Sequence, residues 1–312
     1  MLRDARQMSI PRHLQLLDSA LEKRKHLQTS ETNLLRLLDG EGDDLPGVYL
    51  ESLGDHWLVS TQGPRLSPEL KAALLDRAPH SLYWKRLDQH QKDSPIHLGG
   101  VEAPEFFTGL ENRLKVRLSF QSGYSQGIFL DQRNNRKTLR EMMAPGKTLL
   151  NTFAYTGFFS VAAAAAGATT STLDLSQVYL DWARENLRLN EIDPTDHYFC
   201  KGDTFHWLKR FAKQGRQFDA IILDPPTFSR DDKGKVFRVE KDYPHLFQLA
   251  LACLAPGGTI LACHNYRGMT VTEFEEQLRE TAPVGAKICS QKMPSDFSES
   301  PYLKSVWVTL GQ

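Results

Sequence analysis

The sequence TLLNTFAYTGFFSVAAAAAGATTSTLD, residues 148–174, decides the fold that the rest of the chain must fit. Its apolar start predicts a strand and residues 153–157 a tight turn, and the alanine-rich run that follows predicts a helix. Residues 170–174 predict a second strand that ends on Asp174. Strand, helix and strand in this order make a parallel βαβ unit, which places the turn and Asp174 on the same edge of the sheet.

That edge is where open α/β sheets bind ligands. Gly157 would let the backbone approach a ligand closely, and Asp174 can accept hydrogen bonds from two ribose hydroxyls. The alternative is that Asp174 only caps a helix that starts near Ser176. The fingerprint G-x-G-x-x-G is absent, which argues against a nicotinamide or flavin dinucleotide more than against S-adenosylmethionine, because the latter has no phosphate.

Helices and strands continue to alternate after Asp174. We expect helices over residues 177–190, 205–213, 243–254 and 273–280, and strands over 197–200, 218–223, 259–263, 287–290 and 305–310. Five βα steps followed by two closing strands predict an α/β fold with a Rossmann-like, doubly wound, seven-stranded sheet. We assign this domain to residues 121–312.

Residues 1–120 predict a small N-terminal α/β accessory domain for RNA or substrate binding. An amphipathic helix over residues 11–27 precedes strands at 34–38, 48–50 and 57–60, a helix at 67–77, and strands at 82–85 and 113–120. The first helix ends in the charged run Glu22-Lys23-Arg24-Lys25. We expect this run to face solvent, with RNA contact as the alternative.

The composition sets limits on partners. Lysine plus arginine and aspartate plus glutamate both number 38, so any nucleic-acid site must be a local patch. The 4 cysteines form no C-x-x-C pair, which argues against a zinc site and against a disulfide framework. Because no apolar run is long enough to span a bilayer, we predict a soluble, cytoplasmic protein without metal or membrane partners.

Two polar segments surround the βαβ unit. In GIFLDQRNNR, residues 127–136, Asp131 either caps a helix running to Met143 or faces the ligand crevice with Gln132 and Arg133. In the second reading a basic stripe follows, made of Arg136, Lys137 and Arg140.

The second segment is DPPTFS, residues 224–229, at the end of an apolar strand. Its two prolines fix φ and remove two N–H donors, so the corner is rigid and rich in acceptors. Phe228 could stack on a planar group held there. A plain strand-ending turn is the alternative. A basic region follows, with Arg230, Lys233, Lys235, Arg238 and Lys241.

Together these motifs resemble the class I S-adenosylmethionine-dependent methyltransferases of large-subunit (23S) ribosomal RNA, which modify cytosine C5 or guanine N7. The resemblance rests on NTFAYTG (151–157), DLS (174–176), Asp203, DPPTFS and GIFLDQR (127–133), and covers roughly residues 115–312. LLDGEGDDLPG (37–47) resembles the small domain that precedes catalysis in that family. Some relatives carry an N-terminal RNA-binding PUA domain, for which the chain before Glu31 is too short.

The resemblance implies roles for single residues. Phe153, Tyr155 and Gly157 would lie along the methionine part of S-adenosylmethionine. Asp174 would bind the ribose hydroxyls, Asp203 the adenine amino group, and Asp224 would lie near the methyl donor. Asp131, Arg133 and Leu175 complete the cofactor-binding set, and Asp224, Phe228 and Asn265 form the predicted catalytic set.

The chemistry of the two bases differs. Cytosine C5 is a poor nucleophile that enzymes activate with a cysteine thiolate, whereas guanine N7 has a lone pair and needs only placement in line with the methyl group. Our alignment places Asn265 where that thiol would lie, with Cys263 two residues earlier. The sequence therefore favours guanine N7. The alternatives are cytosine C5, a small-molecule or protein methyltransferase, and an RNA-binding module without activity.

Overall fold

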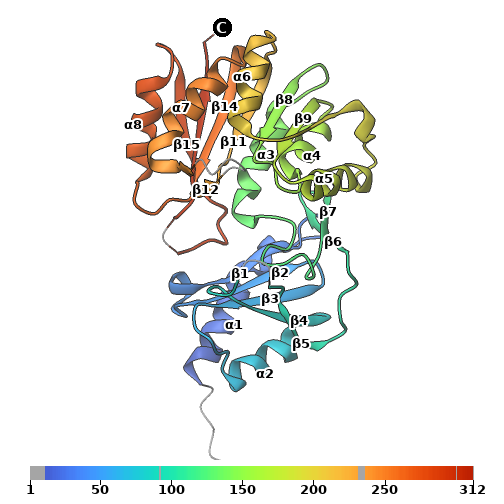
Figure 1. Ribbon diagram of the computed structural model, residues 1–312. Coiled ribbons are helices and arrows are strands. Elements are labelled where there is room, and N and C mark those ends of the chain that lie inside the picture. Colours follow the sequence, from blue (N-terminus) through green and yellow to red (C-terminus); the bar gives the residue numbers. More distant parts are fainter. Residues whose placement is uncertain (1–10, 91–92, 231–235, 300, 312) are drawn as a thin grey trace, which may run out of the picture. The chain divides into compact units, whose positions relative to one another are not determined.

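The computed structural model describes residues 11–90, 93–230, 236–299 and 301–311. The chain divides into two compact units, coloured along the sequence in Figure 1. The first comprises Met1–Arg113, Leu118–Gln126 and Ser295–Ser300, and the second comprises Leu114–Arg117, Gly127–Pro294 and Pro301–Gln312. A short segment close to the C-terminus thus belongs to the first unit, which the sequence did not indicate.

The second unit is built on a seven-stranded sheet in the order β10-β9-β8-β11-β14-β16-β15. Its strands are β8 (Thr148–Thr152), β9 (Thr169–Asp174), β10 (Tyr198–Lys201), β11 (Phe218–Leu223), β14 (Leu254–His264), β15 (Lys287–Gln291) and β16 (Lys304–Thr309). β8 pairs in parallel with both β9 and β11, whereas β16 is antiparallel to β14 and β15. The predicted doubly wound α/β fold is confirmed. The strand order reverses between β8 and β11, which is where such sheets bind ligands.

Helices cover both faces of this sheet (Figure 1). α3 (Arg133–Met142), α4 (Phe158–Ala164) and α5 (Gln177–Leu189) lie on one face, and α6 (Thr204–Lys213), α7 (Val239–Leu251) and α8 (Val271–Thr281) on the other. Successive strand residues point to opposite faces, so Ile222 joins the core under α3 and α4 and Ile221 the core under α6, α7 and α8. Every predicted helix of the second unit is present, with ends shifted by a few residues.

The first unit has a five-stranded sheet in the order β1-β2-β3-β4-β5. Its elements are α1 (Arg12–Arg24), β1 (Leu34–Asp39), β2 (Val48–Leu53), β3 (His56–Thr61), α2 (Pro68–Arg77), β4 (Ser81–Arg86) and β5 (Ile96–Gly100). A core of leucines, with Trp57 and Val59, lies between this sheet and the two helices. The sequence indicated all of these elements except β5.

The remaining elements are short. β6 (Phe107–Glu111) pairs with β7 (Leu114–Leu118), and β12 (Phe228–Arg230) with β13 (Val236–Arg238). Single 3-10 turns lie at Lys25–Leu27, Gly40–Asp43, Leu130–Gln132 and Pro194–Asp196. Within the described ranges, no helix has both the length and the apolar character needed to cross a lipid bilayer.

Arg24 corrects the expectation that the end of α1 is solvated. Its side chain is buried and lies 2.7 Å from the carboxylate of Asp43. The guanidinium also donates to the carbonyl of Asp296 at 3.0 Å and to Ser298 Oγ at 2.9 Å. One buried cation therefore fastens the segment from near the C-terminus to α1 and the Gly40–Asp43 turn. Lys25, by contrast, is exposed as expected.

Replacing Arg24 by alanine should lower the free energy of unfolding by about 3 kcal/mol, because the buried Asp43 carboxylate loses its closest cation and keeps only the 3.5 Å contact with the exposed Lys23. Urea denaturation measures this loss. Lys25→Ala is the matched control, since its pair with Glu22 is solvent-exposed and removing it should change the free energy by no more than about 0.5 kcal/mol. Equal effects of the two substitutions would contradict the structural role of Arg24.

Candidate functional site

The turn after β8 has an unusual backbone. Phe153 and Tyr155 have φ values of 51° and 50°, in the left-handed region that non-glycine residues rarely adopt. Such conformations cost about 1–3 kcal/mol each and occur where a site constrains the chain. The amide of Ala154 donates to the carbonyl of Leu173 at 3.1 Å, and that of Tyr155 to Asp174 Oδ2 at 2.9 Å. The turn is thus held by the end of β9.

Packing inside the protein also requires glycine at position 157. Its φ is 73°, and a Cβ added there would lie 2.5 Å from the Cβ of Ala183 in α5. The close approach that requires glycine in the structure is therefore packing between the turn and α5.

Asp174 ends β9, as predicted, and both of its oxygens accept backbone hydrogen bonds. Oδ2 accepts from Tyr155 and Oδ1 accepts from the amide of Ser176 at 2.8 Å. The cap of α5 is Ser176, whose hydroxyl accepts from Tyr179, so the helix-cap interpretation of Asp174 is wrong. A carboxylate has about four acceptor sites, which leaves capacity for further donors. Burial raises the pKa of Asp174, although these N–H bonds act in the opposite direction.

Leu175 follows Asp174 in the chain, and strand pairing brings the segment that contains Asp203 next to it. β10 pairs with β9 so that Lys201 is opposite Asp174, and Asp203 follows two residues later. Asp203 caps α6 by accepting from the amide of His206 at 2.8 Å. Leu175 exposes 46% of its surface, which is unusual for a leucine and leaves an apolar face at this edge.

Asp131 lies in the 3-10 turn that precedes α3. The helix-cap interpretation is wrong here too, because the cap is Gln132 and it makes no side-chain capping bond. Asp131 Oδ2 instead accepts a hydrogen bond from the hydroxyl of Tyr302 at 2.9 Å. Arg133, which we predicted in the cofactor-binding set, is 8% exposed.

The basic stripe predicted on α3 is also wrong. Arg136 is buried, donates to the carbonyl of Phe129 at 2.9 Å and lies over the rings of Phe158 and Phe159. Lys137 is exposed, but it is paired with Glu141 on the same helix. Arg140, the third residue of the predicted stripe, is half-buried, so the stripe does not form a continuous exposed surface.

Asp224 follows β11 and is the acceptor of a buried polar network. Gln132 Nε2 donates to Asp224 Oδ2 at 2.8 Å, and Asn135 Nδ2 donates to both Gln132 Oε1 and Ser305 Oγ. Sequence reasoning missed Asn135 and Ser305, because their positions carry no local signal. The network connects α3 to the ends of β11 and β16.

Burial, followed by the negative charge of Asp131, raises the pKa of Asp224 to about 7. The hydrogen bond from Gln132 and the charge of Arg136 reduce the increase. Carboxyl groups whose pKa is shifted in this way are common at functional sites.

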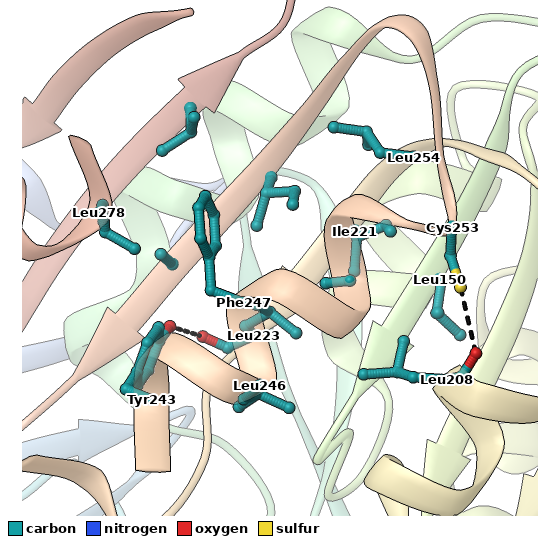
Figure 2. Packing of buried hydrophobic residues seen from close by; sticks show 14 of the residues in the cluster. Leu150, Leu208, Ile221, Leu223, Tyr243, Leu246, Phe247, Cys253, Leu254 and Leu278 are labelled. Carbon is teal, nitrogen blue, oxygen red and sulfur yellow. Dashed lines mark hydrogen bonds between the residues drawn. The ribbon is translucent and has the colours of Figure 1, made fainter. Parts of the chain in front are cut away.

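The Asp224–Thr227 corner is fixed from two sides. The hydroxyl of Tyr243 in α7 donates to the carbonyl of Leu223 at 2.9 Å, immediately before the corner, as Figure 2 shows. Thr227 Oγ1 donates to Asn265 Oδ1, which brings the corner and the end of β14 together. The exposed Asn265 thus lies beside the residues it was predicted to act with.

Parts of the predicted site lie outside the described residues. Phe228 begins β12, but its side chain is not among those described, and neither is that of Arg230; Lys233 and Lys235 lie in the undescribed range 231–235. Arg238 is described and exposed.

Cys263 is unsuited to nucleophilic attack. Its side chain is 0% exposed, and its Sγ lies 3.7 Å from Ser305 Oγ. Burial, reinforced by the charge of Asp224, raises the pKa of the thiol well above its usual value. The thiolate, which is the reactive form, is therefore scarce at neutral pH. Nowhere in the described ranges do three or more His, Cys, Asp or Glu side chains gather as a metal site would need.

Comparison with known proteins identifies what this arrangement resembles. A family model described as S-adenosylmethionine-dependent methyltransferase matches residues 80–301. Ribosomal RNA large subunit methyltransferase K of Neisseria meningitidis serogroup B is 34% identical over 80% of this chain and 71% of its own length. The K/L enzyme of Chromohalobacter salexigens is 34% identical over 93% of this chain, which spans only 41% of that longer protein.

Methyltransferase I of Klebsiella pneumoniae, also named for large-subunit ribosomal RNA, is 31% identical over 85% of this chain and 71% of its own length. Among solved structures, SMU.776 was assigned as a methyltransferase and crystallised with SAH. It matches with a TM-score of 0.87 and 33% identity over 95% of this chain and 80% of its own.

The pKa of Asp224 predicts a pH dependence of stability. Because the folded-state pKa is raised above that of the unfolded chain, the contribution of Asp224 is fully present below about pH 4 and is lost as the pH rises towards 7. Asp224→Asn should therefore gain stability relative to the natural protein as the pH rises from 5 to 7, by at most about 1.4 kcal/mol per pH unit.

Urea denaturation at several pH values tests this. Asp181→Asn, at an exposed carboxylate on α5, is the control and should show a constant difference from the natural protein. A difference between Asp224→Asn and the natural protein that stays constant from pH 5 to 7, as in the control, would show that Asp224 is already ionised over this range.

Proposed function

Because this chain belongs to the S-adenosylmethionine-dependent methyltransferase family, we propose that it methylates a base of large-subunit ribosomal RNA, with guanine N7 as the target. The RNA substrate is supported by the names of relatives that are 31–34% identical over most of this chain. The observation that carries the proposal is the polar corner at the sheet edge, where Asp224, Thr227 and Asn265 converge beside the buried Cys263.

The cofactor site that we propose uses residues on three adjacent strand ends. Asp174 would accept from the ribose hydroxyls and Asp203 from the adenine amino group, with the exposed Leu175 against the ring. The residues fit this cofactor because two carboxylates, which accept hydrogen bonds, lie at the ends of neighbouring strands, next to an apolar surface. Phe153, Tyr155 and Gly157 would position the methionine part, with Asp131 and Arg133 opposite.

When bound, S-adenosylmethionine supplies a methyl group on a positively charged sulfur. The side chains of this protein then have one main task, which is to hold a base in line with that methyl group. Asn265, fixed by Thr227, offers an amide to the base edge, and we assign Phe228 to stacking on its face. Asp224, with a pKa of about 7, would be favoured as an anion near the sulfonium charge.

Guanine N7 is supported over cytosine C5 by the state of the cysteines. Attack at C5 needs a thiolate at the sheet edge. Cys263 is near that edge but buried and protonated, and Asn265 occupies the position at which we align the nucleophile. N7 carries its own lone pair and loses no proton, so it needs neither nucleophile nor base. Cytosine C5 and a small-molecule or protein substrate are the competing assignments.

Asp174→Ala should weaken binding of S-adenosylmethionine about tenfold or more, because hydrogen bonds to a charged group contribute about 1.5–3 kcal/mol. Isothermal titration calorimetry measures the affinity, and circular dichroism shows whether the strained turn still folds. Asp181→Ala is the control, because that carboxylate is exposed and pairs with Arg184. Unchanged affinity in folded Asp174→Ala would remove Asp174 from the site.

Cys263→Ala should retain most of its methyl-transfer activity, whereas Asp224→Ala and Phe228→Ala should each reduce turnover through misplacement of the base. The assay is transfer of a labelled methyl group to unmodified ribosomal RNA or ribosomal particles, followed by nucleoside mass spectrometry. An inactive but folded Cys263→Ala, or a covalent adduct of Cys263 with 5-fluorocytosine in the RNA, would replace guanine N7 with cytosine C5.

A further inference from the structure

The outer face of α6 carries a row of basic residues. His206, Lys209, Arg210 and Lys213 are spaced at i, i+3, i+4 and i+7, which places them on one side of the helix, and all four are exposed. The opposite side buries Leu208 and Phe211 in the core beneath α7 and the sheet. Lys201, at the end of β10 just before α6, is also exposed.

Among the described residues these cations have no acidic partner, whereas Lys137, Arg184 and Arg188 on α3 and α5 do. Within the part of the chain that the structure describes, no carboxylate oxygen lies within 4.0 Å of the side-chain nitrogens of Lys201, Lys209, Arg210 or Lys213. By contrast, α5 pairs its arginines with Asp181 and Glu185, and α3 pairs Lys137 with Glu141, all one helical turn apart.

The arrangement on α6 has an energetic cost. The helix TFHWLKRFAK contains no acidic residue, and Lys209 and Lys213 are like charges at i, i+4, which destabilise a helix by about 0.2–0.5 kcal/mol. The helix dipole favours Arg210 and Lys213 in the last turn. It does not favour Lys201, which lies at the N-terminal end. Stability of the helix alone therefore does not explain the row.

Aromatic rings accompany the charges. The guanidinium of Arg210 lies 5.0 Å from the ring centroid of Trp207, whose Nε1 donates to the carbonyl of Lys201 at 3.1 Å. Tyr198 on β10 is 55% exposed. Cations that neutralise phosphates next to rings that can stack on bases are the combination by which proteins bind single-stranded RNA.

We propose that Lys201, Lys209, Arg210 and Lys213, here called the cationic face, bind the phosphate backbone of the substrate RNA. This inference rests on the proposed function, because it assumes an RNA substrate. The chain as a whole has no net charge, so RNA capture needs a local surface, and α3 does not provide one because Arg136 is buried and Lys137 is paired.

The location of the cationic face suits this role. α6 begins at Asp203, and Lys201 is opposite Asp174 in the sheet, so the face starts at the edge proposed for cofactor binding and extends along the helix. RNA held there would run towards the site where its base is methylated.

The test compares two triple variants of equal charge. Lys209→Gln/Arg210→Gln/Lys213→Gln removes the charges of the cationic face on α6. Lys137→Gln/Arg184→Gln/Arg188→Gln removes the same number of positive charges from cations that already have acidic partners. Binding of an in vitro transcript of 23S ribosomal RNA is measured by fluorescence anisotropy across a potassium chloride series, together with calorimetry of S-adenosylmethionine binding.

We expect the α6 variant to lose affinity for the transcript about tenfold or more at 100 mM salt, and its salt dependence, the slope of log K against log salt, to become shallower by about 2–3. The control variant should stay within about twofold of the natural protein, and both should bind S-adenosylmethionine normally. If the natural protein shows no salt-dependent RNA binding, both the RNA substrate and this inference fail.

If the natural protein binds the transcript with a steep salt dependence and the two variants behave alike, the proposed function stands and the cationic face is not the RNA-binding surface. The inference is equally overturned if the α6 variant keeps its RNA affinity but loses binding to vesicles containing phosphatidylserine, which would identify an anionic membrane as the partner.

Discussion

The hydrogen bond from the amide of Tyr155 to the carboxylate of Asp174 is the constraint on which the site depends. Two non-glycine residues of the turn after β8 have left-handed backbones, at a cost of about 1–3 kcal/mol each. Two hydrogen bonds offset part of that cost. One is the bond from the Tyr155 amide to the charged Asp174 carboxylate, and the other runs from the Ala154 amide to the carbonyl of Leu173. The turn and the end of β9 are therefore positioned together, and a cofactor meets a preformed edge.

The polar network around Asp224 sets the chemistry available at the same edge. Partial burial next to Asp131 makes ionisation of Asp224 costly, and the amides of Gln132 and Asn135 organise the network without adding charge. Cys263 lies against the same network, and the same burial keeps its thiol protonated. An environment that suppresses a thiolate favours a reaction in which the base brings its own lone pair.

The distribution of charge separates structural from functional cations. Arg24 and Arg136 are buried and bind carbonyls, carboxylates or aromatic rings inside their own units, so they contribute to packing. The exposed lysines and arginines of α6 do not. A chain with no net charge can in this way present a local positive surface, because its positive and negative charges are distributed unevenly.

The sequence by itself determined the order of the helices and strands of the seven-stranded sheet and the strand ends on which Asp174 and Asp224 lie, because hydrophobic periodicity and turn residues are local signals. It also placed Asn265 next to the Asp224 corner through a family resemblance. Only the tertiary structure revealed the left-handed Phe153 and Tyr155, since neither residue type indicates such a backbone. The contact of Asn135 with Ser305 joins positions 170 residues apart, and the burial of Arg24 and Arg136 depends on partners from other elements. Contacts of this kind form only once the chain has folded, so no pattern of neighbouring residues encodes them.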